Sequence, residues 1–329
     1  MVLFAPLSTA QDDGATGRTA FLRTRERARA AHQVGMDALL IDDRQSMGDP
    51  AGSTMYEAGT IAAALAVASE GIGLVTAIAT EQLAPYHVAR AVATVDHLSG
   101  GRAGWEVRSA SDDNEVANYR RGPATDPAQR SARAAEFIRV VTGLWDSFDD
   151  DAFDRDRASG SYFVPERLHA LDHEGEYFDV AGPLNIARPP QGHPVLVHRL
   201  TGPTSQTLAG RLADVLIVPT DSARDVAEIR QGVRASASGA DRAPEDVLIL
   251  LEWRVRDEDR PDHLSDLVEA GAVDGFALLP PRGPIEASED AMLRLAADLR
   301  RNVSRSPEPG QTLRARLGLP RPADRRTVV

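Results

Sequence analysis

Apolar residues along the chain follow two alternating patterns. Short runs of consecutive apolar residues, rich in Val, Ile and Leu, are separated by longer segments in which apolar residues recur every three or four positions. The first pattern is typical of strands that are buried on both faces of a sheet, and the second is typical of amphipathic helices. We expect strands at residues 2–7, 37–42, 72–80, 103–109, 193–199, 214–219, 247–255 and 274–280.

A helical pattern follows each of these eight predicted strands. In 131–148, for example, Ala134, Phe137, Val141 and Leu144 recur at helical spacing. Eight repeats of a strand and a helix predict an α/β fold with a closed parallel barrel, the (β/α)8 or TIM barrel. Because such barrels often form one domain of this length, we expect a single domain over residues 1–329.

Two segments interrupt the alternation of strands and helices. Residues 149–192 begin with an acidic loop and continue with a predicted hairpin, whose arms are "HEGEYFDV" and "LNIARPP". The C-terminal tail, 307–329, is rich in Arg and Pro, and we expect it to wrap over the surface.

Composition excludes several classes of function. The net charge is −12, which argues against a nucleic-acid groove and against binding to an anionic membrane. The chain has no cysteine, which excludes disulfides, thiolate metal sites and a cysteine nucleophile. No apolar run approaches the roughly 20 residues of a membrane span, and the N-terminus lacks the basic stretch of a signal peptide. We therefore expect a cytoplasmic protein.

Polar residues follow several of the predicted strands. The active site of a (β/α)8 barrel lies at the carboxyl ends of its strands, so these residues predict a ligand site without identifying the ligand. The residues at these positions include Asp42, Asp43, Thr80, Glu106, Arg108, His198 and Arg199.

Glu106 and Arg108 lie two positions apart in "GRAGWEVRSASDD", so their side chains share one face of a strand. They are candidates for an ion pair that fills the pocket, for a ligand site, or for a surface salt bridge of little energetic value. His198 is a candidate general acid or base, and a hydrogen-bonded structural histidine is the alternative.

Several long motifs carry a resemblance to a known family. The segment "IGLVTAIATEQLAPYHVARAVATVDHLSGGRAGWEV" resembles a block of the luciferase-like flavin-dependent monooxygenases, in the branch with nitrilotriacetate monooxygenase, the sulfone monooxygenase and the pristinamycin synthase large subunit. The segments "ARAAEFIRVVTGLWDSF", "LDHEGEYFDVAGPLNIARPPQGHPVLV", "AGAVDGFALLP" and "QTLRARLGLPRP" resemble the same branch in the same order. The resemblance covers nearly the whole chain.

This resemblance implies a (β/α)8 barrel that forms a homo-oligomer, or a hetero-oligomer with a paralogue. It also implies reduced FMN, delivered by a separate flavin reductase, which reacts with oxygen to give a peroxyflavin that oxygenates a small organic substrate. The chemistry then belongs to the cofactor, and the protein binds and orients. The flavin contacts that the resemblance implies are Asp43, Thr80, Glu106, Arg199 and Thr201.

The chain departs from the family pattern at the implied flavin site. Where the family has Gly-Trp-Asn, this chain has Gly-Trp-Glu at 104–106, and the family's phosphate-binding Gln-Ala-Gly-Ser is His-Arg-Leu-Thr at 198–201. A phosphate loop needs small residues, so Leu200 obstructs it, while Arg199 supplies positive charge. A carboxylate at Glu106 disfavours an electron-rich reduced flavin.

The region between the seventh and eighth predicted strands is also shorter than the family's. Two histidines, His169 and His173, lie four positions apart, but His173 matches the family's hairpin and we expect no metal site. Three functions stay open: an FMN-dependent monooxygenase, a family member that has lost flavin and serves as a partner subunit, and a flavin-independent enzyme. The last would use Glu106, Arg108 and His198.

Overall fold

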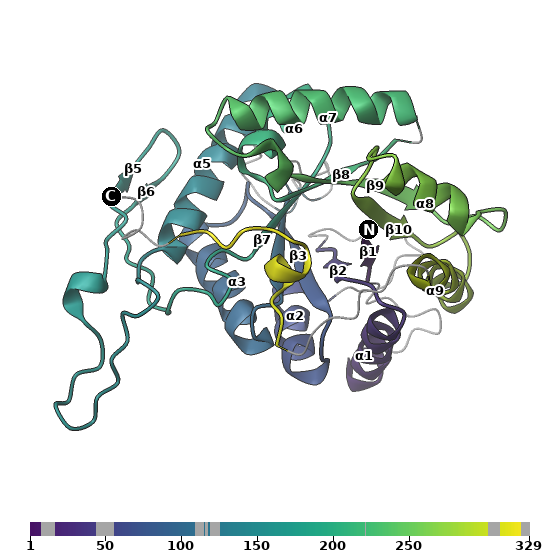
Figure 1. The fold of residues 1–329 in the computed structure, drawn as a ribbon. Helices are drawn as coiled ribbons and strands as arrows, with labels where there is room; N and C mark the ends of the chain where they lie inside the picture. The colour runs from purple at the N-terminus through teal and green to yellow at the C-terminus, as the bar shows by residue number, and fades with distance from the viewer. Residues whose placement is uncertain are drawn as a thin grey trace.

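A closed barrel of parallel strands forms the centre of the molecule, as Figure 1 shows. The computed structural model describes residues 1–7, 17–43, 56–108, 115, 118, 126–220, 222–301 and 310–323. Within these residues eight strands close the barrel, which confirms the predicted fold. In their order around the barrel they are β1 (Val2–Pro6), β2 (Ala38–Ile41), β3 (Gly73–Ala79), β4 (Ala103–Arg108), β7 (Val195–Arg199), β8 (Val215–Val218), β9 (Leu248–Arg254) and β10 (Gly275–Leu279).

A helix follows each barrel strand and covers the outside of the barrel. Side chains of one parity along each strand fill the interior and those of the other parity pack against the helices, so the strands are apolar throughout. None of the described helices is long and apolar enough to cross a membrane. The covering helices are α1 (Gly17–Gln33), α2 (Ala58–Ala68), α3 (Pro85–Ser99), α5 (Pro127–Trp145), α6 (Pro203–Leu212), α7 (Ala223–Ser238), α8 (Pro261–Glu269) and α9 (Ile285–Arg301).

Strand β4 shows how this alternation positions the site. Trp105 points outward, where its ring lies 5.8 Å from Phe137 and 6.5 Å from Trp145 of α5. Gly104 faces the interior, and a Cβ there would lie 2.9 Å from a methyl group of Val75. The next residue of the same parity is Glu106, so the packing of Trp105 directs the Glu106 carboxylate into the barrel.

The hairpin in 149–192 is shorter than we expected. Its arms are β5 (His173–Glu174) and β6 (Asp179–Val180), so the prediction of "LNIARPP" as the second arm is wrong. The turn is held by α5, because the Glu136 carboxylate accepts hydrogen bonds from the backbone N–H groups of Tyr177, at 3.1 Å, and Phe178, at 2.9 Å. A short 3-10 helix, η1 (Pro165–Arg167), precedes the hairpin, and a second, η2 (Pro244–Asp246), precedes β9.

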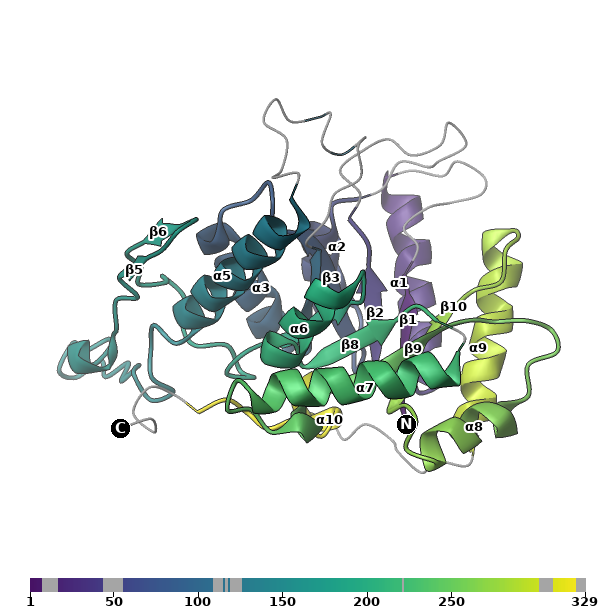
Figure 2. The same ribbon diagram turned by 90° about the horizontal axis from the view of Figure 1, so that it is seen from above.

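The C-terminal tail closes one end of the barrel, so the expectation that it only wraps over the surface is wrong. Figure 2 shows α10 (Leu313–Arg316) at the end where the strands begin. Leu313, Leu317 and Leu319 are buried in the cluster that fills the barrel interior. The Arg314 guanidinium pairs with the Asp214 carboxylate, at 2.5 Å, directly before β8. Residues 307–309 and 324–329 of the tail lie outside the described residues.

Candidate functional site

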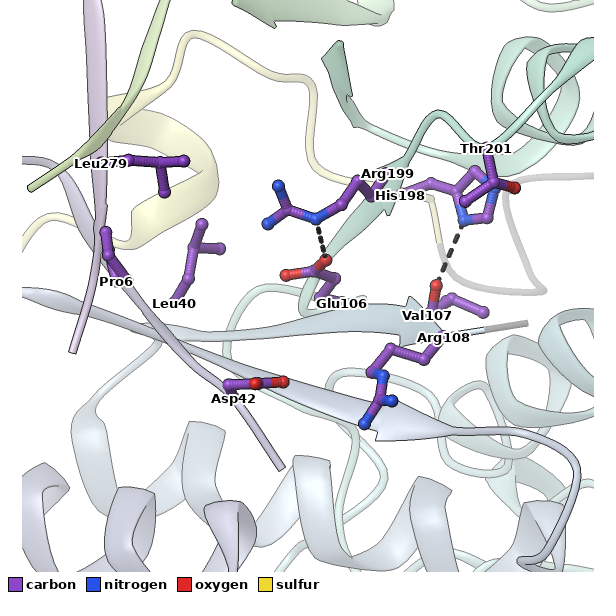
Figure 3. A pocket seen from close by; sticks show the side chains of 10 residues that line it. All are labelled: Pro6, Leu40, Asp42, Glu106, Val107, Arg108, His198, Arg199, Thr201 and Leu279. Carbon is purple, nitrogen blue, oxygen red and sulfur yellow. Dashed lines mark hydrogen bonds and ion pairs between the residues drawn. The ribbon is translucent and has the colours of Figure 1, made fainter. Parts of the chain in front are cut away.

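A pocket of about 390 Å³ lies at the opposite end of the barrel, where the strands finish. This is the end at which (β/α)8 barrels carry their ligands, and the volume is at the small end of ligand sites. Figure 3 shows the lining side chains, which are Pro6, Leu40, Asp42, Glu106, Val107, Arg108, His198, Arg199, Thr201 and Leu279.

Arg199 lies between two carboxylates in this pocket. Its Nε donates a hydrogen bond to Glu106 Oε1 at 3.0 Å, and a terminal nitrogen of the same guanidinium pairs with Glu252. The Glu106 side chain is 7% exposed and that of Arg199 is 32% exposed. Burial lowers the pKa of Arg199, but Glu106 and Glu252 outweigh burial and raise it. The guanidinium is therefore held charged between the two carboxylates, and we call these three residues the Arg199 clamp.

The clamp joins three strands of the barrel wall. Glu106 comes from β4, Arg199 from the adjacent β7, and Glu252 from β9, which lies beyond β8. Ile217 of β8 is in register with both Arg199 and Leu250, so the Arg199 side chain reaches across β8 to Glu252. The bridge thus ties together strands that share no direct backbone hydrogen bonds.

Arg108 does not pair with Glu106, which corrects one of the interpretations above. A terminal nitrogen of Arg108 donates to both carboxylate oxygens of Glu115, at 2.9 and 2.8 Å, and the other binds the backbone carbonyl of Asp43. Figure 3 shows its guanidinium pointing away from the pair formed by Glu106 and Arg199. The two β4 side chains share a face, but each pairs with a residue from elsewhere in the chain.

Asp43 and Thr80, two of the predicted flavin contacts, lie near Arg108. Burial, and then the charge of Glu57, raise the pKa of Asp43 to about 6, although Arg108 opposes them. Thr80 is buried, and its hydroxyl donates to the Arg108 carbonyl at 3.4 Å. The side chain of Thr80 is therefore turned to the β4 backbone.

His198 is buried beside the pocket. Its Nδ1 lies 3.2 Å from the Val107 carbonyl, and its Nε2 has no hydrogen-bond partner in the part of the chain that the structure describes. Burial lowers the pKa of His198 to about 4, so the ring is neutral near pH 7. Glu106, Arg108 and His198 all line the pocket, but within the described residues no hydrogen bond links any two of their side chains; the predicted acid–base set is not assembled as a unit.

Thr201 lies directly after β7, at the start of the loop that leads into α6. Its backbone N–H donates to the Ser205 hydroxyl at 2.9 Å. Leu200 beside it is half-buried and packs against the core. The loop at 198–201 is thus closed on the first turn of α6.

Two residues of the site, Glu252 and Glu115, were not predicted from the sequence. Glu252 alternates with Leu248 and Leu250 along β9, so its parity already placed it on the inner face. For Glu115, 109–114 lie outside the described residues, and no pattern in the sequence pointed to it.

The two histidines that suggested a metal site pair with different acids. His169 Nε2 lies 3.0 Å from Asp149, and His173 Nε2 lies 3.2 Å from Glu136. No group of three or more His, Asp or Glu side chains among the described residues is arranged to hold a metal ion.

Comparisons with known proteins agree on one family. The model of the luciferase-like monooxygenases matches residues 1–312. One of the subunits of pristinamycin IIA synthase from Streptomyces pristinaespiralis is 40% identical over 98% of this chain and 98% of its own length. Nitrilotriacetate monooxygenase component A of Aminobacter aminovorans is 40% identical over 60% of this chain, but the match spans only 43% of that protein.

A solved structure extends the agreement to the fold. EDTA monooxygenase from Chelativorans sp. BNC1 superimposes with a TM-score of 0.80 over 98% of both chains, at 24% sequence identity.

Proposed function

Because the chain belongs to the luciferase-like monooxygenase family, we propose that it is a subunit of a two-component flavin monooxygenase. Such a complex oxygenates a small organic compound with reduced FMN, and a separate flavin reductase supplies the reduced FMN. The flavin carries out the oxygen chemistry, while the protein binds, orients and excludes water.

One observation carries this proposal. The chain matches a protein named as a synthase subunit from end to end, whereas its match to the longer nitrilotriacetate monooxygenase component spans less than half of that protein. A relative that covers the whole length and is itself one subunit of a synthase favours a subunit role here. The partner is then a second barrel of the same family, either another copy or a longer paralogue.

Two arrangements satisfy this function. In the first, FMN binds at the mouth of this barrel, against Asp43, Thr80, Glu106, Arg199 and Thr201. In the second, FMN binds to the partner chain, and this chain serves as a structural or substrate-binding subunit. The Arg199 clamp favours the second, because it places two carboxylates on the cation that the first arrangement requires.

Reconstitution tests the proposal. The protein is mixed with a longer luciferase-like chain from its own organism, a flavin reductase, FMN and NADH, with each component also omitted in turn. We expect the two barrels to elute together on size exclusion, and oxygen consumption without release of hydrogen peroxide to need both. The proposal fails if the chains elute separately and the longer chain oxygenates substrate equally well alone.

A further inference from the structure

We infer that the Arg199 clamp occupies the mouth of this barrel in place of a ligand and keeps FMN out of it. The inference rests on the proposed function and deepens it, because it assigns the flavin of the complex to the partner chain. Three observations support it: the charges at the mouth, the loop that leads into α6, and the burial of Glu106.

The charges at the mouth do not fit FMN. Asp42, Glu106 and Glu252 surround Arg199, so three carboxylates face one guanidinium. Arg108 adds no net charge, because Glu115 neutralises it. FMN carries an anionic phosphate, and its reduced ring is electron-rich. In a half-buried pocket these carboxylates repel such a ligand more strongly than they would in water.

The loop that leads into α6 does not fit a phosphate either. Phosphates bind at helix N-termini through free backbone N–H groups. Here the Thr201 N–H donates to the Ser205 hydroxyl, and Pro203, at the start of α6, has no N–H to offer. Leu200 further fills the space beside the loop where a small residue would admit an anion.

The burial of Glu106 keeps Arg199 in place. A carboxylate that is 7% exposed is strongly destabilising without a cationic partner. Arg108 cannot replace Arg199, since Glu115 and the Asp43 carbonyl hold its guanidinium on the other side. A ligand phosphate that recruited Arg199 would leave Glu106 buried and unpaired. The clamp therefore competes directly with any anion for the same guanidinium.

Removal of both glutamate charges tests the clamp. The variant Glu106→Gln/Glu252→Gln keeps the shape of both side chains and frees Arg199. The control Glu245→Gln/Glu258→Gln makes the same change of net charge at two exposed positions. Oxidised FMN is titrated by fluorescence quenching, and reduced FMN is titrated anaerobically by calorimetry.

We expect no binding to the wild type or the control up to about 1 mM, and at least about tenfold tighter binding to the clamp variant. Micromolar binding of reduced FMN to the wild type overturns the inference, although the subunit function would stand. A folded clamp variant with no gain in affinity also overturns it. Failure of the reconstitution above, with the FMN results as expected, would instead refute the subunit function.

A second measurement covers the case in which the clamp variant does not fold. In the wild type, the Nε–H of Arg199 should exchange with solvent far more slowly than that of the exposed Arg211, and addition of FMN should not change its rate. Equal exchange at the two arginines, or a change on addition of FMN, overturns the inference.

Discussion

Substitution of Leu313 by Ala tests whether the tail is a structural part of the barrel. Leu313 lies at the start of α10 and is fully buried. Its side chain reaches β3, because a Cβ placed on Gly73 would lie 2.8 Å from Leu313 Cδ1. We expect Leu313→Ala to destabilise the whole protein.

The surroundings of Leu313 set the size of the effect. Replacement of a buried Leu by Ala costs about 2–5 kcal/mol, and the cost is largest where neighbours cannot move into the cavity. The neighbours here are Gly73 and Ala38, on the backbones of β3 and β2. Strands in a closed barrel are fixed on both sides by hydrogen bonds, so we expect about 3–5 kcal/mol.

Urea-induced unfolding measures this cost through the shift of the midpoint at an unchanged slope. The control is Leu98→Ala on α3, where the side chain is 47% exposed, and we expect a change within about 0.5 kcal/mol. A cost for Leu313→Ala below about 1 kcal/mol would refute a rigid contact between the tail and the barrel.

Two further predictions concern His198 and Glu136. The pKa of His198 is lowered from 6.5 to about 4, so the ring is neutral in the folded protein and protonated in the unfolded chain below pH 6.5; the stability it contributes is present above pH 6.5 and is lost as the pH falls towards 4. In urea titrations between these values, His198→Gln should flatten the pH dependence and the exposed His263→Gln should not; equal slopes for all three proteins would contradict this. Glu136→Ala should cost about 1.5–3 kcal/mol and speed hydrogen exchange at the Tyr177 and Phe178 amides, while the exposed Glu174→Ala should leave both rates unchanged. Unchanged exchange in Glu136→Ala would show that α5 does not hold the turn.

The barrel could be predicted from the sequence because the apolar pattern repeats eight times, and each repeat reports on its own local structure. The tail could not be predicted in this way. Its buried leucines are few and are mixed with Arg and Pro, and Arg314 is buried by a salt bridge to Asp214, which lies 100 positions away. The hairpin was misjudged for a similar reason, since Glu136 holds its turn from 41 and 42 positions away.

The site shows the same boundary between local and distant information. Alternation along β4 correctly placed Glu106 and Arg108 on the pocket side, because the period of a strand is a local property. Their partners depend on how the barrel closes: Arg199 lies 93 positions from Glu106, and Glu252 lies another 53 positions away. A single sequence gives no signal for contacts of that kind.

The coupling between Glu106 and Arg199 follows from their burial and can be measured. Arg199→Ala should cost about 3–5 kcal/mol, because it leaves Glu106 charged and 7% exposed without its cation. Glu106→Gln should cost less, since Arg199 keeps Glu252 as its partner.

The double variant Glu106→Gln/Arg199→Ala contains no unpaired charge at Glu106, so its cost should fall below the sum of the single costs by about 1–3 kcal/mol. The pair Arg25→Ala and Glu26→Gln, an exposed salt bridge, serves as the control and should be additive within about 0.5 kcal/mol. Additivity at Glu106 and Arg199 would mean that they do not interact when buried. An anion could then recruit Arg199 at no cost to Glu106, and the clamp would not exclude FMN.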